Sequence, residues 1–142
     1  MESRKRYKEL EKEYLTYNAL DEKFIGFQKL CLDHPYLDVF DVKDHKPQKL
    51  NEEQQKQELI AFTLLFSIFE RAYIMYVCMK QAKEIREEQW KGWEEYIQNY
   101  CQRPNFVEAW KKSGTTFDER FTDYMNDTLK TYGYNQPADS KQ

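Results

Sequence analysis

Residues 64–76, LLFSIFERAYIMY, decide the fold because they form the most apolar stretch of the 142-residue chain. An acid and a base, Glu70 and Arg71, interrupt this stretch near its middle. A charge that leaves water is costly unless it is paired. The two charges therefore indicate a membrane span, a structural ion pair or a functional site.

The membrane interpretation depends on a window of 21 apolar-rich residues, 59–79, which is close to the length of a membrane-spanning helix. Each charge near the bilayer centre costs about 2.5–3.5 kcal/mol, which offsets most of the gain from the Leu, Ile and Phe side chains. The flanking sequences are strongly charged on both sides without a clear asymmetry. We therefore expect a helix that is buried among other helices rather than in a membrane.

The central helix has a clear start signal. Asn51 and Gln54 form a capping box, in which each side chain bonds the other residue's backbone N–H. We expect the helix to end near residues 80–83, whose lysines complement the negative end of its dipole. Within it, Glu70 and Arg71 are either anchors paired to other helices or part of a pocket or subunit interface.

The N-terminal segment is expected to be a long helix. Its large residues recur at close to heptad spacing: Tyr7, Leu10, Tyr14, Tyr17, Phe24 and Cys31. This pattern predicts one helix, or two with a break near Asn18, that ends before Pro35. We interpret residues 1–18 as a charged stalk or linker helix, residues 19–132 as the bundle domain and residues 133–142 as a disordered tail.

The rest of the chain is expected to be a loop and three further helices. Residues 35–50 form the loop, which should be anchored to the core by Tyr36, Leu37, Val39 and Phe40. A helix follows at about 85–102. Two further capping boxes are predicted to open the last two helices, and they pair Asn105 with Glu108 and Thr116 with Glu119.

The composition agrees with a helical fold. The chain has four Gly and four Pro, 16% of its residues are aromatic, and no strand pattern competes with the helical ones. Few breakers and many large side chains favour helices around a bulky core. The sequence therefore predicts an all-α helical bundle with a long N-terminal helix and a buried central helix.

Charge and cysteine content narrow the class of function. The net charge of −3 argues against a long nucleic acid as partner, although a local basic pocket for a small anion remains open. Cys31, Cys78 and Cys101 lie in apolar contexts without the spacing of a zinc site. We interpret them as reduced core thiols of a cytosolic domain.

Catalysis is not expected. The segment 33–45 carries four Asp together with His34 and His45, but its spacing matches neither a calcium loop nor a zinc protease motif. A nucleophile would have only these two histidines as its base, and the chain has no glycine-rich phosphate loop. We expect no metal, no cofactor and no enzyme activity, with a metal-dependent enzyme built on this loop as the weakest alternative.

A ligand site is suggested by aromatic and basic residues that interleave along 86–112. Aromatic faces stack on nucleobases, and Arg or Lys neutralises phosphate. The candidate ligand-binding residues are Arg71, Arg86, Trp90, Lys91, Trp93 and Arg103. The competing expectation is that the core claims at least two of the three tryptophans, Trp90, Trp93 and Trp110.

Five motifs carry a resemblance to a known family: LDHPYLDVF, IFERAYIMY, W-x-x-W-x-x-Y-I, RPNFVEAW and FDERFTDYM. Over about residues 20–126 the chain resembles a family of bacterial helical domains that have an acidic-His-Pro segment, a Glu in the central helix and a Trp-rich helix. Such domains commonly follow transmembrane helices and have no assigned catalysis. The resemblance implies that Glu70 occupies the family's central acidic position and that a membrane segment lies outside this chain.

The layout is also similar to the cytosolic domains of CRISPR-associated membrane effectors of type III systems. That resemblance implies an antiviral sensor on the cytoplasmic side of the inner membrane, which binds cyclic oligoadenylate at the interface of a homo-oligomer. Arg86, Lys91 and Arg103 would contact phosphate, and Trp90 or Trp93 would stack on a base. The alternative is a protein-interaction or scaffold domain that has no small-molecule ligand.

Overall fold

The computed structural model describes residues 2–40, 49–78, 83–113 and 116–133. All regular structure in these ranges is helical: α1 (Glu2–Asp33), α2 (Glu52–Cys78), α3 (Lys83–Tyr100), α4 (Pro104–Ser113) and α5 (Glu119–Tyr132). The predicted all-α bundle is confirmed. His45 and almost all of the predicted tail lie outside the described residues.

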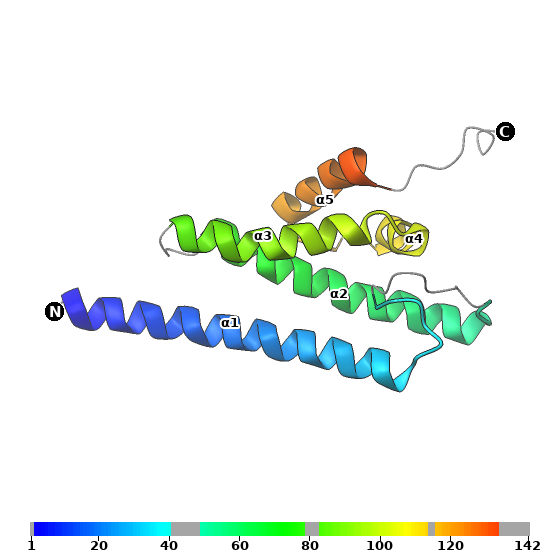
Figure 1. Cartoon of the computed structure of the whole chain (residues 1–142), viewed down its shortest axis with the longest axis horizontal. Coiled ribbons are helices and arrows are strands. Elements are labelled where there is room, and N and C mark those ends of the chain that lie inside the picture. The colour runs from blue at the N-terminus through cyan, green and yellow to red at the C-terminus, as the bar shows by residue number, and fades with distance from the viewer. Residues whose placement is uncertain (1, 41–48, 79–82, 114–115, 134–142) are drawn as a thin grey trace.

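Helix α2 is the centre of the bundle, where it contacts α1, α3, α4 and α5 (Figure 1). Its buried side chains recur at spacings of three and four residues: Ala61, Phe62, Leu65, Phe66, Ile68, Phe69, Ala72 and Met75. By length and composition α2 would also pass as a membrane span. Packing against four helices favours the interpretation as a core helix.

The core is built mainly from aromatic rings. Phe66 is fully buried, and edge-to-face contacts join it to Phe106 and Trp110 of α4, with ring centroids 5.0 and 5.2 Å apart. Trp90 and Trp110 are buried and Trp93 is half-buried, so the core claims two of the three tryptophans, as expected. Such interlocked rings leave little freedom in how the helices pack.

Helix α1 is a single helix without a break at Asn18, so the expected boundary between stalk and bundle falls inside it. Its C-terminal half packs on α2 through Leu20 and Phe27, which are both buried. The helix ends at Asp33, as predicted from Pro35. Its N-terminal end extends past the first turn of α3 (Figure 1).

The capping box that opens α2 is confirmed in both directions. The Asn51 N–H donates to Oε1 of Gln54 at 3.0 Å, and the Gln54 N–H donates to Oδ1 of Asn51 at 2.8 Å. Helix α2 is described up to Cys78, so the predicted end near residues 80–83 falls mostly outside the described residues, and Lys83 belongs to α3. Cys78 is also exposed and therefore is not a core thiol.

The other two capping boxes are wrong. Helix α4 begins at Pro104, because proline suits the first helical position, where the backbone needs no N–H donor. The N-cap of α5 is Asp118, whose carboxylate accepts from the N–H groups of Arg120 and Phe121. Thr116 lies outside the helix and donates to the Ser113 carbonyl oxygen instead.

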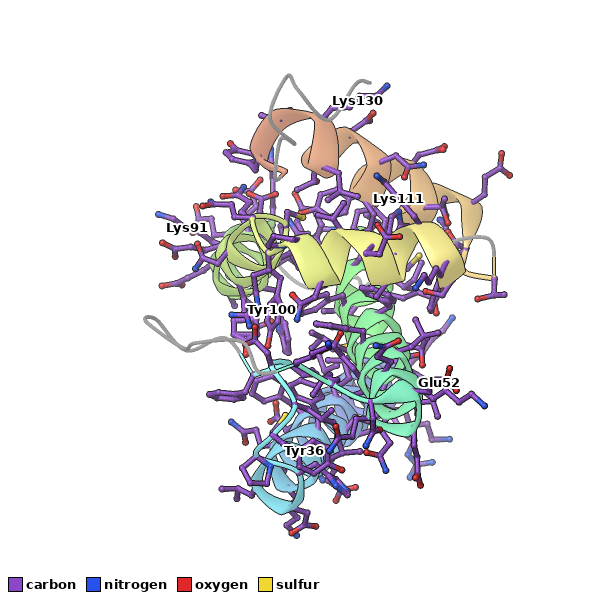
Figure 2. The ribbon with its side chains drawn as sticks, turned by 90° about the vertical axis from the view of Figure 1, so that its right-hand side faces the viewer. Tyr36, Glu52, Lys91, Tyr100, Lys111 and Lys130 are labelled. Carbon is purple, nitrogen blue, oxygen red and sulfur yellow. The ribbon has the colours of Figure 1, made fainter. Side chains whose placement is uncertain are left out.

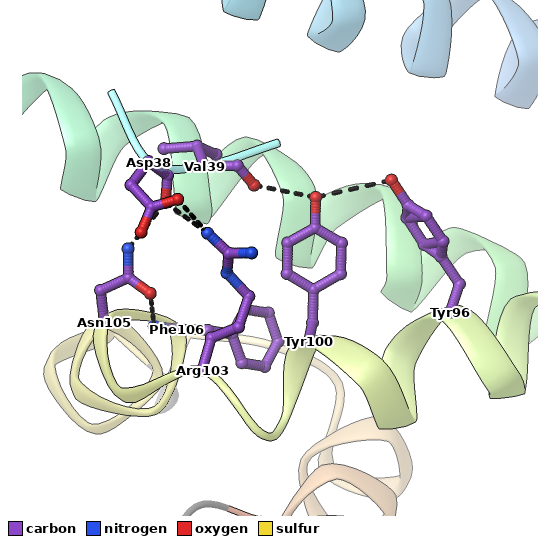
Figure 3. A network of polar contacts seen from close by, with 7 residues as sticks. All are labelled: Asp38, Val39, Tyr96, Tyr100, Arg103, Asn105 and Phe106. Atoms are coloured by element: carbon purple, nitrogen blue, oxygen red, sulfur yellow. Dashed lines mark hydrogen bonds and ion pairs between the residues drawn. The ribbon is translucent and has the colours of Figure 1, made fainter. Parts of the chain in front are cut away.

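The loop after α1 is anchored as predicted, with one exception. Leu37 and Val39 are buried, and the Tyr100 hydroxyl donates to the carbonyl oxygen of Val39 at 2.8 Å (Figure 3). Tyr36 is half-buried and donates to Gln57 of α2. Phe40 is 36% exposed, so it is not a core anchor.

Candidate functional site

Helix α3 has a groove on each side. The first groove lies between α1 and α3 and has a volume of about 560 Å³. Its main walls are Phe24 and Ile25 of α1 and Trp93 and Tyr96 of α3. The ring of Phe24 meets both α3 rings edge to face, at centroid distances of 5.6 and 5.7 Å. The groove therefore has a rigid aromatic floor.

The first groove exposes apolar surface. Ile25 is 49% exposed, and Gly92 has open space where a side chain would project. The same two helices carry two further exposed apolar residues, Ile85 of α3, which is 50% exposed, and Leu32 of α1, which is 78% exposed. A smaller hollow of about 360 Å³ lies beside Leu32. We call these exposed apolar positions of α1 and α3 the apolar track.

The charges around the first groove are mostly acidic. Asp21 is the charged residue among the described residues that line it. Glu88 and Glu95 are exposed on α3 one turn before and one turn after Gly92, which places them at the rim. This groove suits an apolar partner with basic flanks better than it suits a phosphate.

The second groove lies between α3 and α5 and has a volume of about 480 Å³. The aromatic rings of its wall already stack on one another. The ring centroids of Tyr76 and Trp90 are 5.1 Å apart, and those of Tyr73 and Tyr124 are 4.9 Å apart. The Trp90 indole N–H donates to Glu94 at 3.2 Å. The ring faces are thus used in packing, and burial raises the pKa of Tyr124.

Two of the predicted phosphate-binding residues are engaged within the fold. Nη1 of Arg86 donates to the Tyr76 carbonyl oxygen at 3.3 Å, at the C-terminal end of α2. Arg103 forms an ion pair with Asp38 and also donates to the Asp38 carbonyl oxygen at 3.2 Å (Figure 3). Each guanidinium therefore ties one segment of the bundle to another.

The structure brings two of the remaining predicted residues together, because Trp90 and Lys91 both line the second groove. Lys91 is exposed on α3, where its side chain projects outward (Figure 2), and Arg71 is exposed on α2. Trp90 is buried, whereas Trp93 lines the first groove. Arg86, Trp90 and Trp93 border one shared cavity, but its volume of about 10 Å³ suffices for no more than one water molecule.

Glu70 makes a structural hydrogen bond between α2 and the start of α5. Its Oε2 accepts a hydrogen bond of 2.6 Å from the N–H of Asp118, the N-cap residue of α5. This contact favours the anchor interpretation of Glu70. Its neighbour Arg71 lies on the exposed side of α2.

No group of three or more His, Cys, Asp or Glu side chains that could hold a metal ion occurs in the part of the chain that the structure describes. Nδ1 of His34 lies 3.0 Å from the Tyr36 hydroxyl, which in turn donates to Gln57. The second histidine of the predicted loop, His45, is outside the described residues.

Comparisons with protein-family models, with curated proteins and with solved structures found no match. Sequence reasoning missed most of the first groove, including Ile25 and Gly92. One signal was present, because positions 21, 25, 28 and 32 form a row along one side of a helix and two of them are apolar. The opposite wall could not be inferred without knowing that α3 lies beside α1.

Proposed function

We propose that this chain is a non-catalytic interaction domain that binds an amphipathic α-helix in the groove between α1 and α3. The observation that carries the proposal is the exposed apolar track of Ile25, Leu32, Ile85 and the half-buried Trp93. Helix-in-groove recognition uses apolar side chains at spacings of three and four residues, set into such a surface. The large aromatic floor supplies the area that an anchor side chain needs.

Charge supports a basic partner helix. Asp21 lines the groove, and Glu88 and Glu95 lie at its rim. Opposite charges at the rim of an interface accelerate association and select the partner. The engagement of Arg86 and Arg103 inside the fold further favours this function over recognition of a polyanion.

The test uses a synthetic amphipathic peptide with Leu and Tyr at heptad spacing and flanking Lys residues. Binding is measured as protection of tryptophan fluorescence from acrylamide, since Trp93 is the least buried tryptophan. Ile25→Glu should weaken binding by about tenfold or more, because it places a charge in the apolar track. Ile60→Glu is the matched control, since Ile60 is 63% exposed on α2 and does not line the groove. Absence of binding, or equal loss in both variants, would refute the proposal.

A second candidate function is the sensing of cyclic oligoadenylate at the interface of a homo-oligomer. The chain would then belong to an antiviral effector on the cytoplasmic side of the inner membrane, attached through a segment outside this sequence. It is favoured by one observation, the half-buried Trp93 ring in an open groove, where a base could stack. Titration with cyclic tetra- and hexa-adenylate should then raise the melting temperature and change the oligomer mass. Absence of both effects at saturation would exclude it.

A further inference from the structure

We propose that the outer side of α2 pairs two copies of the chain, with the two α2 helices antiparallel about a two-fold axis. The residues on this side are spaced alternately by four and three positions and are exposed or half-buried: Glu53, Gln57, Ile60, Leu64, Ser67 and Arg71. This spacing is that of a coiled-coil seam, and we call the six residues the α2 seam. None of them lines the groove between α1 and α3, so the α2 seam is a second surface.

The α2 seam is exposed, although its helix forms the centre of the bundle. Ile60 is 63% exposed, and Leu64, one turn later, is half-buried. Phe62 and Phe69, on the opposite side of α2, are fully buried. Residues four positions apart are neighbours on a helix surface, so Ile60 and Leu64 form one apolar patch. A second helix laid along the α2 seam covers this patch.

Arg71 is a cation of the α2 seam that is available to another chain. Its side chain is exposed, and it makes no hydrogen bond or ion pair with any other residue that the structure describes. Arg86 and Arg103, in contrast, contact other segments of their own bundle. Glu53, at the other end of the α2 seam, is exposed as well and carries the opposite charge.

The α2 seam is complementary to itself. When two antiparallel copies of α2 cross at the level of residue 62, Ile60 of one copy faces Leu64 of the other. In the same register Glu53 of one copy faces Arg71 of the other. Two-fold symmetry forms each of these contacts twice. The dimer therefore has apolar layers at its centre and an ion pair at each end.

Charge selects this register over its neighbours. A shift by one heptad in one direction places Arg71 against Ile60 of the other copy. A shift by one heptad in the other direction places Glu53 against Leu64. Both shifts set a charge against an apolar side chain and lose the two ion pairs, which is unfavourable. A single alignment of the two helices is therefore expected.

A charge exchange in the full chain tests this pairing by sedimentation velocity, with a reducing agent present because Cys78 is exposed. Wild type should be a dimer. Glu53→Lys places a second cation against Arg71, and Arg71→Glu places a second acid against Glu53. Each variant should raise the dissociation constant of the dimer about tenfold or more. The double variant Glu53→Lys/Arg71→Glu should recover the dimer, because both ion pairs form again with the charges exchanged.

Three further variants serve as controls. Glu52→Lys makes the same charge change in the same turn of α2 but off the α2 seam, so the dimer should persist. Ile60→Glu should dissociate the dimer and leave peptide binding in the groove unchanged, whereas Ile25→Glu should do the reverse. All substituted side chains are exposed, so far-UV circular dichroism should show an intact fold.

The outcomes distinguish the dimer from the helix-binding function. A wild type that stays monomeric at every concentration overturns the dimer and leaves the helix-binding proposal standing. A dimer that survives Ile60→Glu and both single charge variants also overturns it, because the interface then lies elsewhere. Failure of the double variant to recover the dimer, or an equal loss in Glu52→Lys, contradicts the pairing of Glu53 with Arg71.

Discussion

Removal of the Glu70 carboxylate should show how the central helix holds the last one. Glu70 accepts the Asp118 N–H at 2.6 Å, where α5 begins. A hydrogen bond to a charged group contributes about 1.5–3 kcal/mol, and its loss leaves a part-buried N–H without this acceptor. We expect Glu70→Ala to lower the free energy of unfolding by about 2–3 kcal/mol. Glu70→Gln keeps an acceptor oxygen and should cost about 1 kcal/mol.

Urea denaturation followed by circular dichroism gives these free energies, and hydrogen exchange of the Asp118 amide reports the bond itself. Faster exchange is expected at this amide in Glu70→Ala. Glu108→Ala is the control, because it removes an exposed glutamate from the neighbouring helix α4. Equal stability losses in Glu70→Ala and Glu108→Ala, or in Glu70→Ala and Glu70→Gln, would refute the reasoning.

Three further substitutions probe the ion pair of Figure 3, the half-buried Glu58 and the core. Asp38→Ala takes the carboxylate from Arg103, whose side chain is only 14% exposed, and should cost about 3 kcal/mol in urea denaturation; unchanged stability would contradict a structural role. Burial raises the pKa of Glu58 above 4.5, although a hydrogen bond with Asn105 opposes the shift. Because the pKa of Glu58 is higher in the folded than in the unfolded state, ionisation of Glu58 above that pKa lowers the free energy of unfolding. Glu58→Gln should therefore raise the melting temperature at neutral pH, with a gain that vanishes below pH 4.5; a gain independent of pH would contradict this cause. Phe66→Ala opens a cavity among aromatic rings and should cost about 3–5 kcal/mol, and a loss under about 2 kcal/mol would indicate that the core collapses to fill it.

The helices themselves were predictable because their signals are local. Spacings of three and four apolar residues identify a helix face, and the Asn51 capping box places the start of α2. The start of α5 was misplaced because the sequence Thr-Phe-Asp-Glu before this helix offers two residues that can cap it, Thr116 and Asp118. The tertiary structure favours Asp118, since Glu70 of α2 holds its backbone N–H.

By itself, the sequence determined that this protein is a set of helices around an aromatic central helix, because hydrophobic periodicity and capping act within a few residues. Only the tertiary structure decided which cations make structural contacts and where the groove lies. Arg103 pairs with Asp38 across 65 positions, so no local pattern could tell it from a ligand-binding arginine. The groove likewise exists because α1 and α3, which are joined through a loop and the whole of α2, lie close enough to share an apolar surface.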